Sequence, residues 1–227
     1  MRYEIAGEST PVVICDLNDG ESMITESGSM VWMTDNIRMQ TGAQGVRKAL
    51  GRMLTGENIF RNVFTAEGGI GTVAFASSFP GSIVPIEISD TNSVIVQKSA
   101  FLCSEMGVDL SVYLQKKIGT GLFGGEGFIM QRLSGYGTAF LEIDGYCKGY
   151  MLQPGQRIIV NTGNLVMIED TCDISIQTVK GFNNMVFGGE GLFHTVVTGP
   201  GKVLLQSMTI GMMANLLYPY MPHPQQN

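Results

Sequence analysis

The chain has 227 residues, of which 44% are hydrophobic and only 15% are charged, so a disordered or strongly solvated protein is excluded. Its 14 basic and 20 acidic side chains give a formal net charge of −6, which argues against the basic face that binds nucleic acid phosphates. The 30 glycines favour many tight turns between short strands over long helices.

The N-terminal segment, residues 1–11, is predicted to be a strand, and it contains no apolar run of signal-peptide length. No stretch reaches the roughly 18 apolar residues that a membrane span requires. The cysteines lie far apart and form no C-x-x-C pair, so we expect reduced and mostly buried thiols at Cys15, Cys103, Cys147 and Cys172. These features predict a cytoplasmic protein without a membrane span.

Internal repetition begins after this strand. Residues 17–30 can be laid without gaps over residues 88–101 and over residues 152–165. The apolar positions coincide in all three: Leu17 with Ile88 and Leu152, Met23 with Val94 and Ile158, and Met30 with Phe101 and Leu165. Each copy has the pattern of a strand, a turn and a second strand.

A second block repeats Gly-Glu at 56–57, 125–126 and 189–190, and each copy is followed by a Gly-x-Gly turn and an apolar strand. Both blocks recur after about 64 to 71 residues, which indicates three copies of one unit. We place these copies at residues 12–82, 83–146 and 147–211, followed by a C-terminal tail at 212–227.

The short strands and turns of each copy predict an all-β fold of three β-sandwich or jelly-roll-like units. A unit of this size buries too little surface alone, so we expect one compact body with approximate threefold symmetry. Stacking as an open solenoid is the alternative.

Two segments depart from the strand pattern. Residues 43–54 have apolar residues at helical spacing and predict one short connecting helix. The apolar C-terminal segment ends at Pro219, and the pattern leaves open whether it is helical. We expect this tail to dock on its own domain; the alternative is a lid or a contact with a protein partner.

Several segments resemble the bacterial relatives of the altered-inheritance-of-mitochondria family. They are residues 187–192 with 199–207, residues 160–166, which resemble a V-D-T-G-H-L-V signature, and residues 49–57, which resemble an R-x-L-x-G-E signature. The resemblance covers about residues 5–218. It implies a fold like that of the tryptophan RNA-binding attenuation protein, repeated within one chain, and no assigned reaction. Asn161 and Asn164 replace the Asp and His of the signature, which argues against an acid-base or metal role at those two positions.

Motifs for common chemistries are weak. The only histidines are His194, expected in a strand, and His223 in the Pro-rich tail, so neither a His-rich metal centre nor a Cys/His nucleophile is expected. Residues 119–124 fit G-x-G-x-x-G, but no βαβ unit surrounds them, so a nucleotide site is not expected either. We predict no catalytic residues and no cofactor.

The repeated glutamates Glu57, Glu126 and Glu190 are the sharpest candidate site. With threefold packing, the three carboxylates could meet at one axis and bind a cation or share a proton. The alternative, which we favour, is that each glutamate caps its own turn, because a turn recurs whenever its unit recurs.

The leading functional expectation is a non-enzymatic, self-associating β-repeat scaffold or binding protein, because low charge, strand edges and the apolar tail favour a homo-oligomer. The second is a small-ligand or lipid-binding module with an apolar pocket between repeats, lined by Met and Phe. A metal-dependent or hydrolytic enzyme is the least favoured.

Overall fold

The computed structural model describes residues 1–26, 28–41, 61–116, 127–178 and 193–221. The predicted all-β class is confirmed, because antiparallel strands make up most of these residues. The strands are β1 (Arg2–Ala6), β2 (Val12–Leu17), β3 (Ser22–Glu26), β4 (Met30–Met33), β5 (Ile37–Thr41), β6 (Arg61–Ala66), β7 (Gly71–Ala76), β8 (Gly81–Ile88), β9 (Val94–Gln97), β10 (Phe101–Glu105), β11 (Val108–Lys116), β12 (Phe128–Gly135), β13 (Gly137–Asp144), β14 (Cys147–Leu152), β15 (Arg157–Asn161), β16 (Leu165–Glu169), β17 (Asp173–Thr178), β18 (Phe193–Thr198) and β19 (Gly201–Gln206).

Local sequence explains these strands and turns. In β2, Val13, Cys15 and Leu17 are buried while the residues between them are partly exposed, which is the period-two pattern of a strand with one face on the core. Gly20 and Gly155 have φ angles of 81° and 76°. They form the turns expected after the first strand of the first and third copies, where a left-handed residue is required.

The strands form four sheets. Their orders are β1-β2-β7-β4, β5-β6-β3-β10-β13-β8, β11-β12-β9-β16-β19-β14 and β15-β18-β17. β2–β7, β8–β13 and β14–β19 are three consecutive sets of six strands with one pairing scheme. In each set the first and third strands flank the sixth, and the second and fourth flank the fifth.

The third strand of every set carries the same irregularity. The register shifts between Met30 and Trp32 in β4, between Phe101 and Cys103 in β10, and between Leu165 and Met167 in β16. Such a β-bulge displaces one residue and twists the strand locally. The aligned apolar positions of the sequence repeat therefore occupy equivalent places in their strands.

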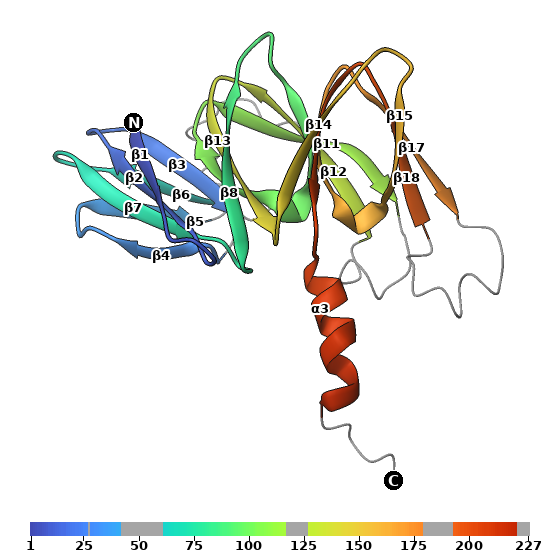
Figure 1. The fold of residues 1–227 in the computed structure, drawn as a ribbon. Helices are drawn as coiled ribbons and strands as arrows, with labels where there is room; N and C mark the ends of the chain where they lie inside the picture. Colours follow the sequence, from blue (N-terminus) through green and yellow to red (C-terminus); the bar gives the residue numbers. More distant parts are fainter. Residues whose placement is uncertain (27, 42–60, 117–126, 179–192, 222–227) are drawn as a thin grey trace.

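Neighbouring sets are joined edge to edge. β3 of the first set pairs with β10 of the second, and β9 of the second pairs with β16 of the third. Figure 1 shows the resulting row, with β4 near one end and β15 near the other. The described strands thus form an open series of sheets, and approximate threefold packing stays a prediction. β8 begins at Gly81, so the copy boundary placed at residue 83 falls inside a strand.

The core extends across the sets. One cluster of buried side chains includes Ile24 from the first set, Leu141 from the second, and Met167 and Leu204 from the third. Each set therefore covers apolar surface of the next, and this shared burial stabilises the whole row.

The C-terminal tail is helical over α3 (Ile210–Leu217). Thr209 is extended, and its hydroxyl oxygen accepts a hydrogen bond from the N–H of Met212 at 3.1 Å, which is an N-cap. The helix projects away from the sheets in Figure 1, and none of its residues is buried. The expected docking of the tail on its own domain is therefore wrong for α3. β19 ends at Gln206, and the extended Thr209 separates the sheet from the start of the helix.

Candidate interaction surface

Of the residues singled out as candidates from the sequence, His194, Asn161 and Asn164 lie in the described part of the chain. Glu57, Glu126 and Glu190 lie outside the described residues, and so do the connecting helix at 43–54, the glycine motif at 119–124 and His223. His194 lies in β18, as expected. Across the described ranges, no group of three or more His, Cys, Asp or Glu side chains could hold a metal ion.

The two asparagines of the signature lie at the ends of the short turn between β15 and β16. The amide of Asn164 donates a hydrogen bond to the carbonyl oxygen of Gln206 at 2.8 Å, and the Gln206 amide donates to the carbonyl of Gly163 at 3.0 Å. Asn164 therefore ties this turn to β19, which is a structural role.

A recurring polar contact was missed by the sequence analysis. The Glu105 carboxylate accepts a hydrogen bond from the N–H of Thr138 at 2.7 Å, and Glu169 accepts one from the N–H of Lys202 at 2.9 Å. In the first set, the Thr34 hydroxyl accepts from the N–H of Thr72 at 3.0 Å. The signal was a polar residue four positions after each aligned Met30, Phe101 or Leu165.

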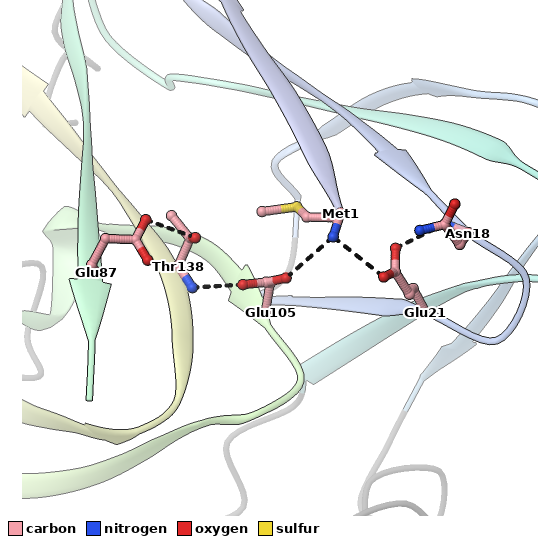
Figure 2. A network of polar contacts seen from close by, with 6 residues as sticks. All are labelled: Met1, Asn18, Glu21, Glu87, Glu105 and Thr138. Carbon is pink, nitrogen blue, oxygen red and sulfur yellow. Dashed lines mark hydrogen bonds and ion pairs between the residues drawn. The ribbon is translucent and has the colours of Figure 1, made fainter. Parts of the chain in front are cut away.

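Figure 2 shows how the acidic residues around Glu105 are used. The Met1 amine lies 3.3 Å from Glu21 and 3.8 Å from Glu105. Glu21 also accepts from the Asn18 N–H at 2.8 Å, and that bond is the main reason its pKa is lowered. These carboxylates contact backbone amides and the N-terminal amine of the same chain. We therefore infer that this network stabilises the fold.

The cysteines are free, and Cys15, Cys103 and Cys172 are buried while Cys147 is half-buried. The expectation of mostly buried thiols is confirmed, and their reduced state stays a prediction. Burial raises the pKa of Cys15 to about 12, and it raises the pKa of Cys103 well above its ordinary value. These thiols therefore lack the lowered pKa of a nucleophilic cysteine.

The clearest candidate surface is apolar and lies on two strand edges. In β4, Val31, Trp32 and Met33 are exposed, and in β15, Ile159 is exposed. Among the described strands, β4 pairs only with β7, and β15 pairs only with β18. A strand edge with free N–H and C=O groups and apolar side chains is a template for pairing with another strand.

A second exposed apolar surface is α3 with the residues that follow it. Ile210, Met212, Leu216, Leu217 and Tyr218 are exposed. A helix with apolar residues on its surface is a typical contact site for a partner.

A cavity of about 380 Å³ lies between the first and second sets. Its lining mixes small polar residues with a few apolar ones: Gly28, Ser29, Val31, Ala76, Ser77, Ser78, Lys98, Ser99, Phe101, Leu102 and Glu142. The Glu142 carboxylate accepts from the N–H of Ser78 at 2.7 Å and from its hydroxyl at 2.8 Å. Phe lines this cavity, as expected of a pocket between repeats, but Met does not.

Comparison with known proteins identifies the family. The family model described as "Mitochondrial biogenesis AIM24" matches residues 3–208. The chain belongs to the AIM24 family. This confirms the family part of the predicted resemblance, whereas the likeness to the attenuation protein stays a prediction.

Two bacterial proteins are similar to this AIM24 family member. An uncharacterised protein of Streptococcus pyogenes serotype M6 is 31% identical over 233 residues, which cover 98% of this chain and 92% of that protein. The crystal structure of a Streptococcus pyogenes protein has a TM-score of 0.80 and 27% identity, and the match covers 97% of this chain and 99% of the other. Within the described residues, no helix has the length and apolar character to cross a membrane.

Proposed function

We propose that this AIM24 family member is a non-enzymatic, cytoplasmic β-repeat scaffold that associates with itself. The apolar strand edges carry this proposal. Among the described strands, β4 and β15 are sheet edges that carry exposed apolar side chains, and contact of apolar surface with water is unfavourable.

The hydrogen bonds of three carboxylates support a structural role for these acidic residues. The carboxylates of Glu21, Glu105 and Glu169 accept hydrogen bonds from backbone amides. A carboxylate held in this way is already bonded and stabilises a turn or strand.

Light scattering coupled to size exclusion tests self-association. We expect a mass that is a multiple of the 24.5 kDa subunit at micromolar concentration. Trp32→Ser should lower the mass, because it removes a large exposed apolar side chain from β4. Tyr146→Ser is the matched control, because Tyr146 is exposed but lies outside both edges. A monomer mass for the unmodified protein, or an equal decrease in mass for the two variants, would contradict the proposal.

The second candidate is a small-ligand-binding module, and the cavity between the first and second sets favours it. Its serines, Lys98 and Glu142 favour a small polar ligand over a lipid. Native mass spectrometry of freshly purified protein should then show a bound small molecule. Ser99→Phe would fill the cavity, so it should abolish that adduct; an adduct that persists would place the ligand elsewhere.

A further inference from the structure

The row of three sets contains two junctions of the same kind and the two halves of a third. At each junction, the second strand of one set pairs antiparallel with the third strand of the next. The second strand of the last set, β15, and the third strand of the first set, β4, are both edges in the described sheets. We propose that β15 of one molecule pairs with β4 of a second copy, which forms this junction between chains.

The two existing junctions fix the register. Ile24 lies opposite Ser104 in the first, and Ile95 lies opposite Ile168 in the second. The repeat and the shared bulge make Ile159 the equivalent of Ile24 and Ile95, and make Met33 the equivalent of Ser104 and Ile168. Ile159 should therefore lie opposite Met33, with Val160 opposite Trp32.

Burial at equivalent positions shows what the missing junction would cover. Ile24 is 1% exposed and Ile95 is 0% exposed, whereas Ile159 is 66% exposed. Ser104 and Ile168 are 0% exposed, whereas Met33 is 39% exposed. These differences follow from the presence or absence of a neighbouring strand. A second copy would bury the same positions in the third junction.

A pair of oppositely charged residues at the end of the proposed junction supports the same register. At the first junction, the backbone N–H of Met106 donates to the carbonyl oxygen of Ser22 at 3.2 Å. At the second, the backbone N–H of Asp170 donates to the carbonyl oxygen of Ser93 at 3.4 Å. The equivalents at the third junction are Asp35 and Arg157, which are both exposed. The Ser93 hydroxyl donates to the Asp170 carboxylate at 3.1 Å.

Asp35 and Arg157 would thus place an acidic group beside a basic one at the position where Ser93 meets Asp170. Opposite charges at this position favour the proposed register.

A second copy is the required occupant because one chain cannot close this junction itself. β4 and β15 lie toward opposite ends of the row in Figure 1. Pairing between copies is head-to-tail, since each molecule offers β15 to one neighbour and β4 to another. Such a heterologous interface builds a ring if the rotation closes and a filament if it does not.

Engineered disulfides test this proposal, which rests on the proposed self-association. Met33→Cys and Ile159→Cys are combined in one chain whose half-buried Cys147 is replaced by serine. Opposite residues of an antiparallel pair have Cβ atoms about 4.5–5.5 Å apart, close to the reach of a disulfide. After mild oxidation, we expect covalent multimers on a non-reducing gel, and only monomers from each single variant.

The other outcomes are decisive. Covalent dimers from either single variant would indicate a symmetric interface, and an internal disulfide in the monomeric double variant would indicate closure within one chain. Either result overturns the proposal. Val112→Cys with Ile159→Cys is the control pair, because Val112 is exposed on the edge strand β11. It should give no multimers.

Charge reversal tests the register independently. Arg157→Glu and Asp35→Arg should each weaken association by about 2- to 5-fold, and the two together should restore it. Loss of association that the double reversal does not repair would contradict the Asp35–Arg157 pair. If light scattering shows an oligomer but the double-cysteine variant stays monomeric, self-association stands and this interface fails. A monomeric unmodified protein would remove both proposals.

Discussion

The Glu105 carboxylate accepts a hydrogen bond from the backbone N–H of Thr138 at 2.7 Å, which joins the end of β10 to the start of β13. Glu105 also lies 3.8 Å from the Met1 amine, which links β1 to the second set of strands. The equivalent residues Thr34 and Glu169 make the same bond to Thr72 and Lys202. This contact is therefore a repeated connection of the fold.

Glu105→Ala should lower the free energy of unfolding by about 1–3 kcal/mol, because a backbone N–H loses a charged acceptor. Glu105→Gln keeps an acceptor and should cost less. Glu67→Ala is the control, because its ion pair with Arg38 is exposed and should contribute at most about 1 kcal/mol. Urea denaturation measures all three. Equal losses for Glu105→Ala and Glu67→Ala would contradict the role given to Glu105.

Gly81 should tolerate no side chain. A Cβ atom there would lie 1.8 Å from the carbonyl oxygen of Ile143 in the paired strand β13. Gly81→Ala should therefore lower the free energy of unfolding by about 2 kcal/mol or more, since the backbone must shift.

Gly149→Ala is the control in the equivalent strand β14, where the nearest atom would be Leu204 Cδ2 at 3.4 Å. Its effect should stay within about 0.5 kcal/mol. Similar losses at both glycines would show that close approach is not the cause.

Asp144 should make stability depend on pH. Burial, and secondarily the charge of Glu142, raise its pKa from 3.8 to about 6. The folded state then binds a proton that the unfolded state releases, so this group's contribution to stability falls as pH rises from about 4 to about 6. Asp144→Asn should raise the Tm more at pH 7.5 than at pH 4. An equal change of Tm at both pH values would contradict the raised pKa.

Local pattern allowed much of the fold to be predicted. The all-β class, the turn glycines Gly20 and Gly155, and the strand at His194 follow from turn chemistry and apolar alternation, which act over a few residues. The direction of α3 did not follow, because its apolar residues fit docking as well as projection. The proposed glutamates Glu57, Glu126 and Glu190 lie outside the described residues.

The identity and spacing of the apolar residues specify where strands form and which positions recur. Ile24, Ile95 and Ile159 are the same residue type at the same place in the repeat, and no local feature distinguishes their burial. Only the tertiary structure shows that the first two are covered by β10 and β16, while the third lies on an edge. The physical reason is that a strand's second neighbour comes from a distant segment of the chain, or from another molecule, so its presence depends on assembly.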